Sequence, residues 1–594
     1  LTAQLRLYGP ADELIDEATL PLPADGQHLS HRFELTAPQL WWPRGYGAQP
    51  LYRLEVSLRQ GEVEHDRRAL RLGIRRLRLV QEPLEDQPGT TFLFEINNRP
   101  IFCGGANWIP ADSLLARITP ERYRAWLQSA VDAHMVMLRV WGGGIYEEDI
   151  FYDLCDELGI LIWQDFMFAC GLYPAHDWFQ SSVAVEAEAA VRRLRHHPSL
   201  ALWCGNNEDY QIAQSINVYD ASFEGDFTQT PFPARAIYER LLPSICQRLD
   251  PLRPYWPGSP YGGPTAIDKT VGDAHVWDVW HGPMAPYHDY PKLGGRFVSE
   301  FGMQASPALE TLQEFAEPDE LLPHSRAFEF HNKATDGPRR LAVYLSDIAR
   351  LPANLEEYIY ATQLLQAEAL RTAYQGWRRQ WAGAGRCAVA GALVWQLNDC
   401  WPVTSWAIID YYLRPKPAYY VVRRALAPLA LGLAQASAGA DVWAMSSLAT
   451  PIEATLELSA WTLDGQQART EHRQVTLAPN QATELGNFAF DNKGQFVVSA
   501  RLVQDSAVVA RAALWPEPFK YLKLPDPQIE LTRLDENTVR LRAARPAKGV
   551  WLQANQPAEW SDNMLDLIPG DDQIITARGL GDAEVQIRWL KEQS

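Results

Sequence analysis

The sequence has no long hydrophobic run and little positive charge. No apolar stretch approaches the roughly 20 residues that a membrane-spanning helix needs. The nearest candidate, residues 425–440, is short and is interrupted by Pro428, Gly432, Gln435 and Ser437. Lys and Arg number 54 against 73 Asp and Glu, which gives a net charge of −19. Because such a charge repels the phosphate backbone, we do not expect nucleic acid as a partner. The lack of a long apolar run predicts no membrane span, and we expect no membrane partner.

Paired cysteines and an initiator methionine are also missing. The seven cysteines are odd in number, widely spaced and mostly flanked by apolar residues, and no CxxC pair is present. They are therefore expected to be buried free thiols and not a disulfide framework or a zinc site. The chain starts at Leu1 in a strand-like pattern, so we expect it to be a piece whose natural N-terminus is missing. Its localisation is left open for that reason.

Tryptophan, in contrast, is abundant. The 594 residues include 22 Trp, 23 Tyr and 20 Phe, and the length corresponds to about four domains. Exposed indole rings are suited to stacking on sugars, although a buried Trp is more often part of a core.

The N-terminal region, residues 1–80, reads as short alternating strands. Apolar and polar residues alternate over 5–8, 32–35 and 51–56, and turn-rich segments such as 43–47 separate them. This spacing without helical periodicity is typical of an immunoglobulin-like β-sandwich.

Residues 81–430 change to a strand-then-helix pattern. A β-hairpin with an Asn97-Asn98 turn is expected first, and then helices that begin at Thr119-Pro120, end at Gly159 and cover 184–197 and 417–427. Buried strands are expected at 135–140, 160–163, 200–203, 274–280, 296–299 and 392–397. This alternation favours a (β/α)8 TIM barrel with long loops. A doubly wound open sheet is the alternative, but the first strand lacks a glycine-rich phosphate turn.

The remaining residues return to strand patterns. Residues 431–520 alternate like a second immunoglobulin-like sandwich, and 521–594 like a small C-terminal β-sandwich domain. The fold class is therefore multidomain α/β plus β, with a central barrel flanked by sandwiches.

Two glutamates follow apolar strands of the expected barrel. Glu208 comes after 200–203 and Glu300 after 297–298. The carboxyl ends of barrel strands meet at one mouth, and glycoside hydrolysis requires two carboxylates, one protonated and one ionised. The alternative is a pair of surface salt bridges.

Five motifs give these residues a family resemblance. They are Leu40 to Gly47 (LWWPRGYG), Arg139 to Gly144 (RVWGGG), Trp203 to Glu208 (WCGNNE), Ser299 to Gln304 (SEFGMQ) and Trp395 to Asp399 (WQLND). Together, and in this order, they resemble the signatures of β-mannosidases of glycoside hydrolase family 2.

The resemblance implies roles for four polar residues. Glu208 would be the general acid/base and Glu300 the nucleophile of a retaining mechanism. Arg139 would favour the ionised form of Glu300, and Asn207 would bind the 2-hydroxyl of the sugar.

The remaining candidates would line the pocket. Trp395 would form the floor of the sugar subsite, with a barrel-plug role as the alternative. Trp141 and Asp165 end the second and third strands, and for Asp165 the alternative is an ion pair with a neighbouring arginine. Trp280 would line the pocket, with a structural role as the alternative.

Histidines raise the question of a metal. His275, His281, His288 and the His196-His197 pair lack the spacing of a helical zinc motif, and adjacent histidines on a helix point about 100° apart. We expect no metal and no cofactor.

The resemblance thus implies an exo-acting retaining β-mannosidase acting on β-mannosides or manno-oligosaccharides, with the oligomeric state open. One rival is another family 2 exo-β-glycosidase, of the β-galactosidase or β-glucuronidase type. The other is a non-catalytic carbohydrate-binding protein on an inactivated barrel. Family members also carry a further N-terminal sandwich that reaches the substrate mouth, and we expect this chain to begin inside the second domain.

Overall fold

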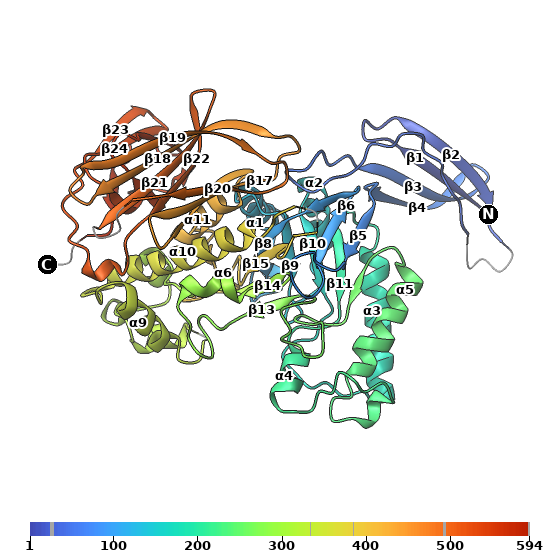
Figure 1. Cartoon of the computed structure of the whole chain (residues 1–594). Coiled ribbons are helices and arrows are strands. Elements are labelled where there is room, and N and C mark those ends of the chain that lie inside the picture. The colour runs from blue at the N-terminus through green and yellow to red at the C-terminus, as the bar shows by residue number, and fades with distance from the viewer. Residues whose placement is uncertain (24–28, 333, 384, 491–494, 592–594) are drawn as a thin grey trace.

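The computed structural model describes residues 1–23, 29–332, 334–383, 385–490 and 495–591. An N-terminal antiparallel sheet lies at one end of the molecule, a barrel surrounded by helices in the middle, and β-sandwiches at the other end (Figure 1). The flanking β-domains and the central α/β unit confirm the expected fold class. The four domain boundaries stay a prediction.

The N-terminal sheet has the order β2-β1-β3-β4. Its strands are β1 Thr2–Tyr8, β2 Leu14–Pro21, β3 Tyr52–Gln60 and β4 Val63–Leu72. The strand expected at residues 32–35 is wrong, because that segment pairs with no strand that the structure describes. The alternation of apolar and polar residues is seen only in burial, since Phe33 and Leu35 are half-buried and their neighbours are exposed.

The expected hairpin is confirmed and packs into the base of the barrel. β6 (Leu93–Ile96) pairs with β7 (Arg99–Ile101) and with β5 (Leu77–Val80). Asn97 and Asn98 take φ of 49° and 65°, which is the conformation that a two-residue hairpin turn requires. The ring of Phe94 meets that of Phe297 with a centroid distance of 6.1 Å.

The barrel strands are parallel and follow one another in chain order around the sheet. They are β8 Cys103–Trp108, β9 Met137–Val140, β10 Leu161–Asp165, β11 Leu200–Cys204, β12 Tyr255–Trp256, β13 Ala274–Val276, β14 Val298–Phe301 and β15 Gly391–Val394. β15 pairs with β8, which is the order of a (β/α)8 barrel and not of an open doubly wound sheet. The described residues contain no ladder between β12 and β13, and there the Asp273 carboxylate accepts bonds from Tyr261 N and Ser259 Oγ instead.

Helices fill the connections between these strands. Those of eight or more residues are α1 Pro120–Asp132, α2 Asp149–Leu158, α3 Asp177–Leu194, α5 Leu242–Leu249, α9 Gly337–Ile348, α10 Leu355–Arg379 and α11 Pro417–Leu426. Shorter ones are α4 Asp209–Ser215, α6 Tyr290–Leu293, α7 Leu309–Leu312 and α8 Arg326–Phe330. The hydroxyl of Thr119 caps α1, accepting from Arg122 N at 3.2 Å. Gly159 ends α2 at φ 77°, as expected from the sequence.

Two β-sandwiches follow α11. The first packs sheet β16-β17-β20 on sheet β19-β18-β21-β22, and the second packs β23-β24-β28-β26 on β27-β25-β29. The first contains β16 Leu429–Gln435, β17 Ala440–Ser446, β18 Ile452–Thr462, β19 Gln467–Leu477, β20 Gln481–Phe488, β21 Phe496–Gln504 and β22 Ala507–Leu514. The second contains β23 Ile529–Asp535, β24 Thr538–Ala543, β25 Ala547–Ala554, β26 Glu559–Trp560, β27 Leu565–Leu567, β28 Gln573–Arg578 and β29 Val585–Arg588. Each has its own apolar core.

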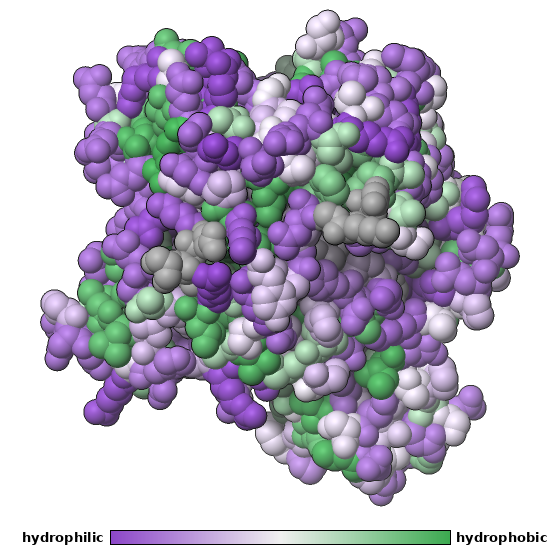
Figure 2. Space-filling model, turned by 60° about the vertical axis from the view of Figure 1, so that its left-hand side comes forward, coloured by the Kyte–Doolittle hydropathy of each residue, from purple (hydrophilic) through white to green (hydrophobic). Residues whose placement is uncertain are grey.

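The surface agrees with the acidic, polar composition. Hydrophilic side chains dominate the face drawn in Figure 2, and hydrophobic ones form separate patches. Among the described helices, none is both long and apolar enough to span a bilayer. All seven cysteines are free thiols, as predicted, and five are buried; the expected burial is wrong for Cys170, which is exposed, and for Cys400, which is partly exposed.

Candidate active site

Two carboxylates face each other at the C-terminal ends of barrel strands. Glu300 lies in β14, and its side chain is 5% exposed. Glu208 follows β11, directly before α4, and its side chain is 22% exposed. One carboxylate oxygen of each lies within 4.8 Å of the other. Glu208 also has φ 65°, a left-handed conformation that is costly for a non-glycine residue and is concentrated at functional sites.

His275, at the end of β13, lies between the two glutamates. Its Nδ1 donates to Glu208 Oε1 at 2.8 Å and lies 3.4 Å from Glu300 Oε2. Its Nε2 is 3.0 Å from Ser259 Oγ, and that hydroxyl donates to the Asp273 carboxylate at 2.6 Å. The imidazole is fully buried, so both of its nitrogens are held in place by these partners.

The positive charge of His275 acts on both carboxylates. Burial raises the pKa of Glu208, but the hydrogen bond and charge of His275 outweigh it and lower that pKa below its ordinary value. Burial raises the pKa of Glu300, against the opposite effects of His275 and Arg139. Burial lowers the pKa of His275, but the charges of Glu300 and Glu208 raise it above the ordinary value. The charged forms of His275 and Glu208 therefore favour each other.

Arg139, in β9, connects the candidate residues. The fully buried guanidinium pairs with Glu300 Oε1 at 2.6 Å and with Asp165 Oδ2 at 2.8 Å. It also donates to Asn107 Oδ1 at 2.9 Å and to Asn207 Oδ1 at 2.6 Å. Asp165 is fully buried behind it, which is the ion-pair arrangement that the sequence left open as the alternative.

Asn207 and Cys170 adjoin Glu208 on the other side. Asn207 Nδ2 donates to Cys170 Sγ at 3.4 Å, and that thiol donates to Glu208 Oε2 at 3.5 Å. Burial and the charge of Glu208 raise the pKa of Cys170 to about 12. The thiol therefore stays protonated and remains a donor to Glu208 at neutral pH.

Tryptophans surround the carboxylates. Trp141 and Trp395 pack edge to face with their centroids 5.1 Å apart, and both are partly exposed. Trp277 Nε1 donates to Glu300 Oε2 at 3.2 Å. Trp280 is fully buried and stacks on Tyr344, so its indole has no exposed face.

The sequence reasoning missed Trp277 and Cys170, and it weighed His275 only as a metal ligand. The strand was expected to cover 274–280, so His275 and Trp277 fell inside it and the strand-end rule passed over them; in the structure β13 ends at Val276. Cys170 lies in a loop, where no sequence pattern marked it.

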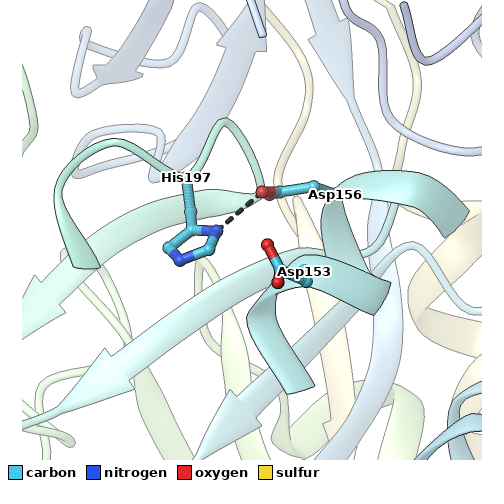
Figure 3. A group of neighbouring side chains, drawn as sticks. All are labelled: Asp153, Asp156 and His197. Carbon is cyan, nitrogen blue, oxygen red and sulfur yellow. Dashed lines mark hydrogen bonds and ion pairs between the residues drawn. The ribbon is translucent and has the colours of Figure 1, made fainter. Parts of the chain in front are cut away.

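A second group of side chains has the composition of a metal site (Figure 3). Asp156 accepts from His197 Nδ1 at 2.6 Å and from Ser199 N at 3.0 Å. Asp153 pairs with Arg71 at 2.9 Å. Both carboxylates thus have partners within the protein. The Glu208–His275–Glu300 group is the other such cluster, and there the hydrogen bonds described above use the same atoms.

Family models match three parts of the chain. Residues 6–75 match "Glycosyl hydrolases family 2", residues 438–521 a "Mannosidase Ig/CBM-like domain" and residues 524–589 an "Ig-fold domain".

Full-length relatives extend the similarity across the barrel. The chain is 44% identical to β-mannosidase B of Emericella nidulans over 95% of its own length and 70% of that protein. It is 41% identical to β-mannosidase B of Thermothelomyces thermophilus, over 99% and 75%.

Solved structures of other glycosidases are similar over the whole length of the chain. The chain superimposes on the β-D-mannosidase of Dictyoglomus thermophilum with a TM-score of 0.89 at 36% identity, over 100% of this chain and 73% of that one. An exo-chitosanase of Amycolatopsis orientalis shares the fold, with a TM-score of 0.76 at 18% identity over 99% and 74%.

Proposed function

Because the chain belongs to the β-mannosidases of glycoside hydrolase family 2, we propose that it releases terminal, non-reducing β-D-mannose by double displacement. The observation that carries this proposal is the approach of Glu208 and Glu300 within 4.8 Å, with His275 between them. Retaining enzymes hold their carboxyl groups about 5–5.5 Å apart, and inverting enzymes about 6.5–9.5 Å. The spacing supports retention.

In the first step Glu300 attacks the anomeric carbon while the bond to the leaving oxygen breaks. Glu208 gives that oxygen a proton. In the second step Glu208 removes a proton from water, which attacks the anomeric carbon and releases Glu300. The ion pair between Arg139 and Glu300 stabilises the ionised nucleophile before attack.

His275 is a positioning residue in this proposal. Its hydrogen bond to Glu208 keeps a proton at the atom that must protonate the leaving group. When substrate separates Glu300 from the imidazole, the shared proton passes to Glu208. Ser259, itself held by Asp273, keeps the imidazole oriented during this transfer.

The sugar subsite is formed by the partly exposed residues. Trp395 supplies the floor against the C–H face of the pyranose, and Trp141 packs on its edge. Asn207 binds the 2-hydroxyl and is oriented by Arg139. Asp165 and Trp280, both fully buried, support Arg139 and the surrounding aromatic residues without contacting the sugar.

Substrate preference tests this proposal against the other family 2 activities. With 4-nitrophenyl β-mannoside, β-galactoside, β-glucoside and β-glucuronide, we expect kcat/KM for the mannoside to exceed the others by about a hundredfold or more, a few kcal/mol of transition-state discrimination. Faster turnover of another glycoside would overturn the assignment of β-mannosides as the substrate. No turnover of any would favour the carbohydrate-binding alternative.

Hydrolysis of a manno-oligosaccharide tests exo action and retention. Mannohexaose should yield mannose and mannopentaose as the first products, with the β-anomer of mannose appearing first in the NMR spectrum. Internal cleavage, seen as early mannobiose and mannotriose, would contradict exo action, and early α-mannose would contradict retention.

Replacing His275 with Gln should move the acidic limb of the pH profile of kcat/KM to higher pH. In the wild type the hydrogen bond and charge of His275 lower the pKa of Glu208 against the effect of burial. In the variant burial acts without this opposition, so the pKa of Glu208 rises and Glu208 alone carries the proton of the acid. Loss of the imidazolium also removes a charge that lowers the pKa of Glu300, so the acidic limb moves to higher pH.

His288→Gln is the matched control for this prediction. His288 is half exposed and pairs with Glu517 away from the site, so its replacement should leave the profile unchanged. A profile of H275Q that falls in height but keeps its acidic limb at the wild-type pH would show that His275 has only a structural role.

A further inference from the structure

A cavity lies at the opposite end of the barrel from the two glutamates. Its volume is about 330 Å³. Gly104, near the start of β8, and Val136, just before β9, form part of its wall, which places it at the N-terminal ends of the strands. Chemistry in such barrels takes place at the other end, so this cavity serves neither of the proposed catalytic steps.

The cavity lies where three parts of the chain meet. Residues 44–47 from the N-terminal region, Arg378 near the end of α10 and Ser446 at the end of β17 all line it. Phe102 and Trp381 add aromatic walls, and their rings pack edge to face with centroids 5.9 Å apart. Its lining is thus a mixture of apolar surface and polar groups from separate domains, which is typical of small-molecule sites.

Arg378 is a buried cation at this cavity that has no carboxylate partner. The residue is only 5% exposed, and no ion pair joins it to another described side chain. Its Nη1 donates to the carbonyl oxygens of Ala425 at 2.7 Å and Ala427 at 2.8 Å. These oxygens belong to the end of α11, where the helix dipole contributes only about half a negative charge. A buried charge that is not fully compensated is costly.

A second arginine adds positive charge to the same space. Arg44 and His134 line it together with Arg378. Burial and then the charges of Arg423, Arg378 and Arg44 lower the pKa of His134 to about 4, so this imidazole lies in a positive potential and is neutral at pH 7.

No negative charge balances these groups within the lining. The described lining residues include neither Asp nor Glu. Burial raises the pKa of Tyr46 to about 12, so its hydroxyl is neutral and cannot act as a counter-ion. The chain as a whole carries a net charge of −19. A positive cavity without an acidic residue is therefore a local feature that composition does not explain.

We infer that this cavity binds a small oxyanion, a phosphate or carboxylate group carried on a compact body, with Arg378 and Arg44 as its charged contacts. Guanidinium groups suit such ligands because their N–H donors match the oxygens in geometry and charge. The volume exceeds that of a bare phosphate and leaves room for a body against Phe102 and Trp381. Binding would compensate the charge of Arg378 and join the three parts of the chain.

Titration of the protein with inorganic phosphate tests the inference. Isothermal calorimetry at constant ionic strength should show one saturable site per chain. Arg44→Ala should weaken the phosphate affinity by about tenfold or more, as expected for loss of a charge-assisted contact. Arg44 is exposed and its backbone N–H, which donates to Gly159 O, is kept in the variant.

Arg68→Ala is the matched control, because Arg68 is an exposed arginine of β4 whose side chain is 83% exposed. It should bind phosphate as the wild type does, and both variants should hydrolyse 4-nitrophenyl β-mannoside at the wild-type rate. If R44A also loses activity, His134→Asn serves as the second variant, and it too should weaken phosphate binding. No saturable site, or equal affinities in the wild type, R44A and R68A, would overturn the inference.

Discussion

Replacing Glu300 with Ala should reduce kcat/KM on every β-mannoside by at least about 10⁴-fold, since loss of a covalent nucleophile costs factors of this order or more. The proposed intermediate is a bond between Glu300 and the anomeric carbon, and no neighbouring group replaces that oxygen. Glu208 cannot do so, because it follows a different strand and is tied to His275 and Cys170. Each tenfold loss corresponds to about 1.4 kcal/mol of barrier.

Glu300→Gln separates chemistry from packing in this experiment. The amide keeps the size of the side chain and an oxygen for Arg139, which stays paired with Asp165, so the variant should fold and still bind mannose. Glu62→Ala, at an exposed turn between β3 and β4, is the control for substitution itself and should be fully active. Activity of E300A within tenfold of the wild type would remove Glu300 from the nucleophile role.

The strand-end rule explains how much of this site the sequence could predict. Glu208 comes soon after the expected strand 200–203 and Glu300 directly after the expected strand 296–299, and parallel strands bring such ends together. The barrel followed from the same runs. β12 is the exception, because its two residues, Tyr255–Trp256, are too few to show any periodicity.

Contacts between distant segments could not be predicted in this way. Asp165 had two interpretations, a sugar ligand or an ion pair, and only its burial behind Arg139 distinguishes the two arrangements. His275 was one histidine among several, and its position between two carboxylates depends on how β11, β13 and β14 are arranged around the barrel. The start of α3 was also misplaced by seven residues, at 184 and not Asp177. No side chain caps this helix, and its first turn contains the exposed Trp178.

Replacing Glu208 with Ala should produce a loss that depends on the leaving group. General acid catalysis contributes about 10²–10⁴-fold, and we expect a loss of this size for manno-oligosaccharides, whose departing alkoxide needs a proton. 2,4-Dinitrophenolate leaves without a proton, so the rate of the first step on 2,4-dinitrophenyl β-mannoside should stay within about tenfold of the wild-type rate. The second step still lacks a base, because Glu208 is the carboxylate that would activate water.

The intermediate on Glu300 should therefore accumulate in E208A, giving a burst of dinitrophenolate followed by slow turnover. Azide needs no base to attack, so it should restore the steady-state rate and form β-mannosyl azide. Cys170→Ala is the matched control. It removes the other partner of Glu208, a thiol 3.5 Å away, but leaves the carboxylate, and it should show neither the burst nor rescue by azide.

Equal losses on both substrates without rescue would instead assign Glu208 to substrate binding, and the proton would have to come from elsewhere. Among the described residues, His275 is the other proton carrier in contact with both carboxylates, and the pH profile of H275Q would distinguish the two assignments.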